Sequence, residues 1–305
     1  MRIDYDALAA LAAVLRHGSF DGAASELGLT QPAVSLRIKS LEDKVGTVLI
    51  QRARPCTATE AGARLLRHAE EVGLLEKALA EDLGQAAGGP ARPLRLAVNA
   101  DSLATWILPA LAETEGFLFE LTVDDQDHSA DWLKRGEVAA AITARAAPIP
   151  GCDCTALGAL PYAATCAPAF AARWFPDGVT AEALSRAPCL TFNRKDRLQA
   201  QWAEAATGHR LALPTHFLPT PQGFITAAKL GIGWGMNPVA LVKEDLAAGR
   251  LVELRPGQRL STPLYWQVSR QAAPALAPLT RALKRQAALF LDRDQSGKPG
   301  QIGAN

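Results

Sequence analysis

A glycine- and proline-rich segment, GQAAGGPARP at residues 84–93, divides the 305-residue chain into two parts with different patterns. The residues before it are almost entirely helical in pattern. The residues after it alternate short apolar runs with helical stretches. Glycine and proline interrupt regular structure, so we expect a domain boundary in this segment. Two domains also suit a chain of this length better than one.

Composition and charge exclude several classes of protein. Hydrophobic residues make up 49% of the chain and charged residues 21%, which is typical of globular proteins and excludes a wholly disordered or fibrous chain. We predict no transmembrane helix, because no apolar run approaches the required length. The first twenty residues are too acidic and too interrupted for a signal peptide, so we expect a cytoplasmic protein. Five irregularly spaced cysteines favour reduced thiols over a disulfide framework.

The second part of the chain has the pattern of an α/β domain. Five apolar runs resemble buried strands: residues 94–98, 119–123, 138–142, 189–192 and 232–236. Helical patterns lie between them, at residues 103–115, 196–206 and 239–248. This alternation predicts a mostly parallel sheet. The polar, glycine-rich tail, residues 294–305, is predicted to be disordered.

The first part contains the pattern of a helix-turn-helix. Ser19 is placed to cap one helix, Gly28 to make a tight turn, and Thr30 to cap the next helix, which Gln31 and Pro32 open. One face of this second helix is apolar and the other is polar and cationic, as in helices that enter the major groove of DNA. A small three-helix bundle with a solvated charged face is the alternative interpretation.

The distribution of charge favours DNA binding. Residues 1–90 contain ten Lys/Arg and twelve Asp/Glu, a net charge of −2, whereas residues 27–67 contain seven and three, a net charge of +4. The positive charge is therefore concentrated on the second helix of the pair and on the segment that follows it. That segment is predicted to form a short hairpin whose Arg52 and Arg54 reach phosphates.

Residues 23–62, AASELGLTQPAVSLRIKSLEDKVGTVLIQRARP followed by TATEAG, resemble the winged helix-turn-helix of LysR-type transcriptional regulators. The family pattern is AAxxLxxSQPAVSxxIxxLExxLGxxLFxR followed by LTxxG, and this chain departs from it mildly, at Thr30, Val45 and Ile50. The resemblance implies a DNA-binding domain at residues 1–58. The residues that it assigns to DNA contact are Thr30, Gln31, Pro32, Ser35, Arg37, Lys39, Arg52 and Arg54.

A long helix is predicted after the wing, over residues 59–86. Leu65, Val72 and Leu79 recur every seven residues, and Leu75 lies on the same seam, as in helices that pair between chains. The alternative is a helix packed on its own domain. In the family that the chain resembles, this helix joins two DNA-binding domains and the assembly is usually a tetramer. We therefore expect a homodimer or homotetramer, with Leu65, Val72, Leu75 and Leu79 at the interface.

Polar residues follow the predicted strands of the second domain, where ligands bind in parallel sheets. Asn99, Asp101 and Ser102 lie between a strand and a helix N-terminus, a position that favours a carboxylate; the alternative is that Asp101 or Ser102 only caps the helix. Asp124 and Asp127 suit a cationic group or a metal, or else belong to a solvated acidic loop. Other candidates for ligand contact are Thr143, Asn193, Trp234 and Met236, although Trp234 and Met236 suit the hydrophobic core equally well.

A narrower resemblance concerns the ligand. LAVNADSLATWILPAL (96–111), RGEVAAAI (135–142), LGALPY (157–162) and WFPDGVT (174–180) resemble the branch of the family that controls lysine and arginine export, also described as inhibitors of chromosome replication initiation. This implies lysine or arginine as effector, and no cofactor or metal. It also implies a two-lobed, periplasmic-binding-protein-like domain at residues 92–293, with lobe I at about 92–162 and 268–293 and lobe II at about 163–267.

The prediction is therefore an α+β multidomain regulator of transcription that binds double-stranded promoter DNA, with RNA polymerase as a further candidate partner. We expect no enzyme, because no catalytic motif or metal-ligand spacing is visible. Two alternatives remain open. One is a regulator that senses another small molecule, or redox state through Cys152 and Cys154. The other is a stand-alone solute-binding protein, which the fused DNA-binding domain disfavours.

Overall fold

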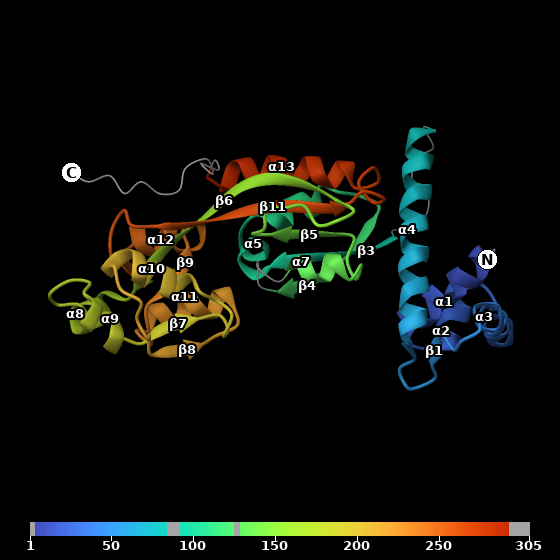
Figure 1. The fold of residues 1–305 in the computed structure, drawn as a ribbon, viewed down its shortest axis with the longest axis horizontal. Coiled ribbons are helices and arrows are strands. Elements are labelled where there is room, and N and C mark those ends of the chain that lie inside the picture. The colour runs from blue at the N-terminus through green and yellow to red at the C-terminus, as the bar shows by residue number, and fades with distance from the viewer. Residues whose placement is uncertain (1–3, 84–91, 125–128, 293–305) are drawn as a thin grey trace. The chain divides into compact units, whose positions relative to one another are not determined.

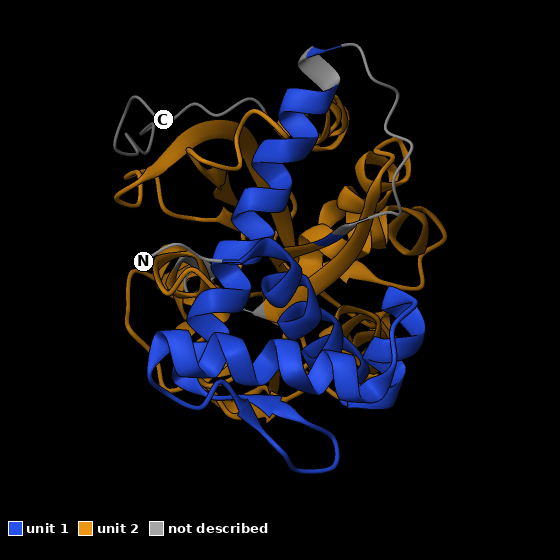
Figure 2. Ribbon diagram, turned by 90° about the vertical axis from the view of Figure 1, so that its right-hand side faces the viewer, with its two compact units in different colours: residues 1–93 blue, residues 94–305 orange. Residues whose placement is uncertain are grey.

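The computed structural model describes residues 4–83, 92–124 and 129–292 (Figure 1). The chain forms two compact units, Met1–Pro93 and Leu94–Asn305, which Figure 2 shows in different colours. The predicted tail at 294–305 lies outside the described residues. None of the helices in the described ranges combines the length and the apolar character needed to span a bilayer.

The first unit is helical apart from one short hairpin. Its elements are α1 (Tyr5–His17), α2 (Phe20–Leu27), α3 (Gln31–Val45), β1 (Ile50–Gln51), β2 (Thr57–Ala58) and α4 (Glu60–Asp82). Buried apolar side chains from α1, α2, α3 and β1 form one core, which includes Leu11, Val14, Val34, Ile38 and Leu41. The spacing of these residues on α3 agrees with the predicted inward stripe. The core therefore holds α2 and α3 as the expected helix pair.

Local sequence explains how this helix pair forms. Gly28 ends α2 in the left-handed region, at φ 64°, and its N–H donates to the Ala24 carbonyl. Glycine adopts this conformation without the steric cost that a Cβ would add. Thr30 then caps α3, because its Oγ1 accepts a hydrogen bond from the Ala33 N–H at 3.4 Å. The chain thus turns within a few residues between two helices.

The second unit contains a seven-stranded sheet. Its strands lie in the order β10 (Val252–Glu253), β6 (Cys152–Cys166), β11 (Leu260–Ser269), β5 (Ala140–Thr143), β3 (Arg92–Asn99) and β4 (Phe117–Asp124), and β9 (Gly235–Pro238) also pairs with β6. Two groups of elements, here called lobe I and lobe II, lie along it (Figure 1). Lobe I contains β3 (Arg92–Asn99), α5 (Ala100–Thr105), α6 (Ile107–Ala112), β4 (Phe117–Asp124), α7 (Ser129–Lys134), β5 (Ala140–Thr143) and α13 (Ala277–Phe290). Lobe II contains α8 (Pro168–Trp174), α9 (Ala181–Arg186), β7 (Cys189–Thr191), α10 (Leu198–Thr207), β8 (Thr215–Phe217), α11 (Pro221–Lys229), β9 (Gly235–Pro238), α12 (Val239–Ala247) and β10 (Val252–Glu253).

Two long strands, β6 (Cys152–Cys166) and β11 (Leu260–Ser269), run between the lobes (Figure 1). They pair antiparallel, from Leu260 opposite Tyr162 to Ser269 opposite Cys152. In lobe II, β6 continues antiparallel to β9. The expectation of a mostly parallel sheet is therefore wrong: β3 with β5 and β7 with β8 are parallel, but the strands that link the lobes are antiparallel.

Neither β6 nor β11 was among the strands predicted from the sequence, and the reason is the same for both. β6 contains Pro161 and β11 contains Pro263, and proline inside an apolar run argues against a strand. A second correction concerns residues 103–115, predicted as one helix. The structure divides this region into α5 and α6 at the fully buried Trp106, whose φ of −131° is not helical. The other predicted strands and helices agree with observed elements to within a few residues.

Candidate nucleic-acid interface and effector site

The polar residues of α3 lie on the surface of the first unit. Thr30, Gln31, Pro32 and Lys39 are exposed, and Ser35 is half-buried. Val34, Ile38 and Leu41 bury the opposite face of the helix in the core. Gln31 and Pro32 stand in the first turn, which is the part of such a helix that reaches base edges. This surface is therefore available to a DNA groove.

Arg37 occupies a different flank of α3 from Ser35. Two residues along a helix are separated by about 200°, and Arg37 lies on the side that meets α1. There its Nη2 is 3.4 Å from Asp6 Oδ2. Because this pair is exposed, it holds the guanidinium only weakly. Arg37 is thus placed at the margin of the α3 surface and beside an acidic group.

The hairpin after α3 forms the wing. Ile50 pairs with Ala58 and Gln51 with Thr57, and the loop between the strands projects from the helices of its unit (Figure 2). Arg52 and Arg54 lie in this loop and are exposed. The Arg52 guanidinium lies 5.1 Å from the centre of the Phe20 ring, which ties the loop to the start of α2. The predicted wing arginines are therefore on a projecting, cationic loop.

Three residues that sequence analysis did not single out hold the wing in place. Glu42 Oε1 accepts a hydrogen bond from the Leu49 N–H at 2.8 Å. Thr59 donates from Oγ1 to the Val48 carbonyl at 2.8 Å, and the same Oγ1 accepts from the Gly62 N–H at 3.1 Å. The family pattern could have identified these residues, because Glu42 is the E of its LE pair and Thr59 and Gly62 are the T and G of its TxxG.

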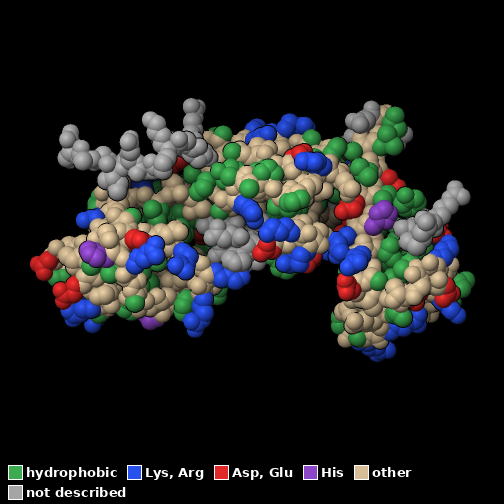
Figure 3. Space-filling view, viewed as in Figure 1, with side chains coloured by type: hydrophobic (Ala, Val, Ile, Leu, Met, Phe, Trp, Pro, Cys, Tyr) green, Lys and Arg blue, Asp and Glu red, His purple; other side chains and the backbone are tan. Residues whose placement is uncertain are grey.

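The predicted seam on α4 divides into two parts. Leu65 packs against the core of its own unit, together with Ala61 and Ala69. This matches the alternative interpretation, a helix packed on its own domain, for the first half of α4. Farther along, Leu75 and Leu79 are 48% and 59% exposed, and Leu83 just beyond the helix is 65% exposed. Figure 3 shows hydrophobic side chains on the surface of this part of α4. Val72 is half-buried. The exposed apolar stripe therefore begins at about Val72 and excludes Leu65.

A small pocket of about 30 Å³ lies between the lobes of the second unit. Asp101 lines it from lobe I, and the lining residues from lobe II are Phe192, Asp196, Leu198, Pro221, Phe224, Met236, Asn237 and Pro238. Asp101 Oδ2 accepts a hydrogen bond from the Tyr162 hydroxyl at 2.7 Å. Tyr162 belongs to β6, so this contact joins α5 to a strand that links the lobes. Two carboxylates, two phenyl rings and a thioether thus surround one space.

Asp196 was missed by sequence analysis, although it stands at the start of the predicted helix 196–206. Its two oxygens accept backbone hydrogen bonds, Oδ2 from Phe192 N–H at 3.1 Å and Oδ1 from Leu198 N–H at 3.0 Å. These bonds fix the carboxylate beside the pocket. Asn237, also missed, is buried and donates from Nδ2 to Thr165 Oγ1 at 3.0 Å. Neither residue has a motif that would single it out.

Several predicted effector residues have other surroundings. Thr143 is fully buried, and its Oγ1 accepts from Gln267 Nε2 at 3.2 Å, so its hydroxyl supports the loop after β5. Trp234 packs against Trp202 in the interior of lobe II, with ring centres 5.2 Å apart. Asn193 Oδ1 accepts from Lys195 N–H at 2.7 Å in the turn before α10. None of the three lines the pocket between the lobes.

The remaining predicted effector residues are Asn99, Ser102 and the two acidic residues Asp124 and Asp127. Asn99 is buried at the N-cap of α5. Ser102 is fully buried, and its Oγ finds no hydrogen-bond partner among the described residues. Asp127 and the side chain of Asp124 lie outside the described residues. Of the predicted effector residues, Asp101 and Met236 are the ones that line the pocket.

The thiols of Cys152 and Cys154 do not have the surroundings of a redox sensor. Both lie on β6, and all five cysteines are free. Burial raises the pKa of both thiols. A raised pKa keeps a thiol protonated and therefore unreactive at neutral pH. The redox alternative has no support here.

A winged helix-turn-helix joined to a two-lobed unit with a pocket defines a class of protein: a DNA-binding regulator that responds to a small ligand. The chain belongs to the LysR family of bacterial transcriptional regulators. Residues 5–63 match the family model described as bacterial regulatory helix-turn-helix protein, lysR family. Residues 87–288 match the model described as LysR substrate binding domain.

Close relatives span nearly the whole chain. The HTH-type transcriptional regulator LysG of Mycobacterium tuberculosis is 41% identical over 300 residues, which is 98% of this chain and 99% of the relative. The crystal structure of ArgP from Mycobacterium tuberculosis has a TM-score of 0.77 and 41% identity, covering 96% of this chain and 100% of that one. Full-length LysG from Corynebacterium glutamicum with bound effector Arg has a TM-score of 0.65 and 33% identity, covering 95% and 100%.

Proposed function

We propose that this regulator responds to a basic amino acid, arginine or lysine, bound between the two lobes of its second unit. The observation that carries the proposal is the pair of carboxylates, Asp101 and Asp196, that line the pocket between the lobes. A relative of 33% identity is described with arginine bound as effector, which supports the same chemical class of ligand here.

The lining of the pocket suits the cationic end and the aliphatic stem of such a ligand. A guanidinium or ammonium group needs carboxylate acceptors, which Asp101 and Asp196 supply. Phe192 and Met236 offer apolar contact to an aliphatic stem. The α-carboxylate needs a donor, and we propose the Ser102 hydroxyl, which has no partner in the described part of the chain. Ser102 is fully buried and lies outside the present lining, so it would reach the ligand only when the pocket enlarges. Asp124 and Asp127 remain candidates for further cationic contacts.

Effector binding requires the lobes to move. A space of about 30 Å³ holds no more than a few water molecules, so an amino acid enters only if the pocket enlarges. We propose that residues 92–162 with 268–293, and residues 163–267, move as two lobes about β6 and β11. A ligand shifts such an equilibrium only by binding one arrangement more tightly than the other.

The output of this movement is a change in promoter binding. We propose that α3 and the wing read a promoter site in double-stranded DNA and that the exposed stripe of α4 joins two copies of the chain. This assembly is a homodimer or a homotetramer. It acts in the cytoplasm, where promoter DNA lies, and RNA polymerase is a further candidate partner.

Calorimetric titration tests the effector assignment. Arginine, lysine and leucine are titrated into the wild type and into Asp101→Asn, Asp196→Asn and Asp124→Asn. Removing one carboxylate from a desolvated charge pair costs about 2–5 kcal/mol, so each variant that loses a contact binds the basic amino acid at least about tenfold more weakly. The matched control is Asp177→Asn, an exposed carboxylate of lobe II. Equal arginine affinity in all variants would discard the site, and tight binding of leucine alone would discard the effector class.

A further inference from the structure

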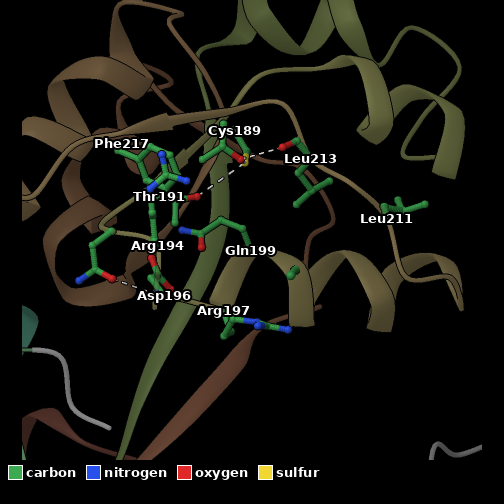
Figure 4. Close-up of a pocket in the computed structure, with 12 residues that line it drawn as sticks. Cys189, Thr191, Arg194, Asp196, Arg197, Gln199, Leu211, Leu213 and Phe217 are labelled. Carbon is green, nitrogen blue, oxygen red and sulfur yellow. Dashed lines mark hydrogen bonds between the residues drawn. The ribbon is translucent and has the colours of Figure 1, made fainter. Parts of the chain in front are cut away.

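Lobe II contains a second pocket, of about 280 Å³, that is distinct from the one between the lobes. It lies between α10 and the β7–β8 pair (Figure 4). Thr191 and Thr215 line it from the strands and Gln199 from α10, while Arg194 and Arg197 come from the connection between β7 and α10. Asp196 is the one residue that lines both pockets. The volume is close to that of small-ligand sites.

The amide of Gln199 is the most informative feature of this pocket. The residue is 2% exposed, and neither Oε1 nor Nε2 has a hydrogen-bond partner among the described residues. A buried amide without partners is costly and rare in folded proteins. Figure 4 shows the side chain reaching from α10 toward the strands. A ligand group that both donates and accepts hydrogen bonds would satisfy it.

The charges around the pocket favour an anion. Arg194 and Arg197 are exposed, and neither forms an ion pair with any side chain that the structure describes. The Arg194 guanidinium lies 5.2 Å from the centre of the Phe217 ring, which holds it at the rim. Asp196 is the acidic residue in this lining, and its two oxygens each accept a hydrogen bond from a backbone N–H group, at Phe192 and Leu198. Burial raises the pKa of the Cys189 thiol in the floor, so the thiol is neutral.

We propose that this pocket binds a small carboxylate that also carries an amide. Gln199 would pair with the amide of the ligand, through one hydrogen bond in each direction. Arg194, at the rim beside Phe217, would bind the carboxylate, because a guanidinium group matches its geometry. The apolar wall formed by Leu211 and Leu213 leaves room for a short alkyl group. The ligand differs in charge from a basic amino acid, so the two pockets bind different effectors.

Titration of the full chain with N-acetyl-L-glutamate tests this proposal, with glutarate as the matched dicarboxylate that lacks the amide. We expect the wild type to bind N-acetyl-L-glutamate at least about tenfold more tightly than glutarate. Gln199→Leu should abolish that preference. Arg194→Ala, which changes an exposed residue and preserves folding, should weaken both compounds. The control Arg186→Ala, on the surface of α9, should bind like the wild type.

A competition titration distinguishes binding in this pocket from binding between the lobes. Saturating arginine should not displace N-acetyl-L-glutamate, although Asp196 lines both pockets, and the variant Asp101→Asn should bind this compound like the wild type. Absence of binding at roughly 10 mM would overturn the proposal. Equal affinities of Gln199→Leu and the wild type, or displacement of N-acetyl-L-glutamate by arginine, would overturn it as well.

Discussion

Gly62 is the residue at which helix α4 meets the backbone just before the first strand of the wing. A Cβ at this position would lie 2.0 Å from the Leu49 carbonyl oxygen, far inside van der Waals contact. Only glycine lets the two backbones approach this closely. The same glycine donates its N–H to Thr59, so it serves both the cap of α4 and the base of the wing.

We therefore expect Gly62→Ala to lower the free energy of unfolding of the first unit by about 1–3 kcal/mol, as overpacking does, and to weaken DNA binding through the displaced wing. Thermal unfolding followed by circular dichroism and a DNA titration measure the two effects. Gly46→Ala is the control, since its Cβ meets nothing within 4 Å although its φ is 78°; DNA binding should survive that change. A Gly62→Ala protein that binds DNA normally would contradict this account of the contact.

At the scale of elements, α3 and the wing contribute differently to DNA binding. The wing arginines contact phosphates in the proposed interface, which every DNA sequence carries, whereas Gln31 and Ser35 face base edges. Arg52→Ala and Arg54→Ala should weaken binding to promoter and random DNA alike and flatten the dependence of affinity on salt. Gln31→Ala should instead reduce the preference for the promoter. Fluorescence anisotropy at several salt concentrations distinguishes these results. If the wild type bound its own promoter no more tightly than random DNA, the proposal that α3 and the wing read a promoter site would be refuted.

Helix α4 combines two functions along its length. Its first half belongs to the core of the helix-turn-helix, and its second half presents the exposed leucines. Val72→Asp with Leu79→Asp should therefore reduce self-association and DNA affinity while the second unit stays folded. Leu65→Ala should lower the thermal stability of the first unit without changing the sedimentation of the chain, because Leu65 packs inward. Unchanged sedimentation of the double variant would exclude this stripe as an interface.

At the scale of the whole molecule, the small volume of the pocket between the lobes links ligand binding to shape. Because about 30 Å³ is too little space for an amino acid, arginine should change the arrangement of the lobes when it binds. Small-angle scattering of the full chain should therefore change on addition of arginine and stay constant on addition of leucine. Asp101→Asn should need more arginine for the same change. Identical scattering with and without saturating arginine would show that the pocket adapts by side-chain movement alone.

Local features of this protein could be predicted from its sequence. The Ser19 and Thr30 caps, the Gly28 turn and the inward stripe of α3 depend on neighbours a few residues away, and the structure contains each of them. The same is true of the boundary near residue 93 and of most strands in the second unit. The concentration of positive charge extended this prediction to the wing arginines, and the position of Asp101 just after a strand placed it among the ligand candidates, because these signals also lie in contiguous residues.

The pairing of the linking strands and the lining of the pocket were decided only by the tertiary structure, because they depend on contacts between residues far apart in the sequence. The two linking strands are paired by a register that joins residues about a hundred positions apart, which their proline-containing sequences conceal. Asp101 and Asp196 line one pocket only because the lobes meet there. Trp234 does not line that pocket, because it packs against Trp202 of α10 in the interior of lobe II. Sequence by itself therefore determined most of the elements, the family and the kind of ligand to expect, whereas packing across the chain determined which side chains share a site.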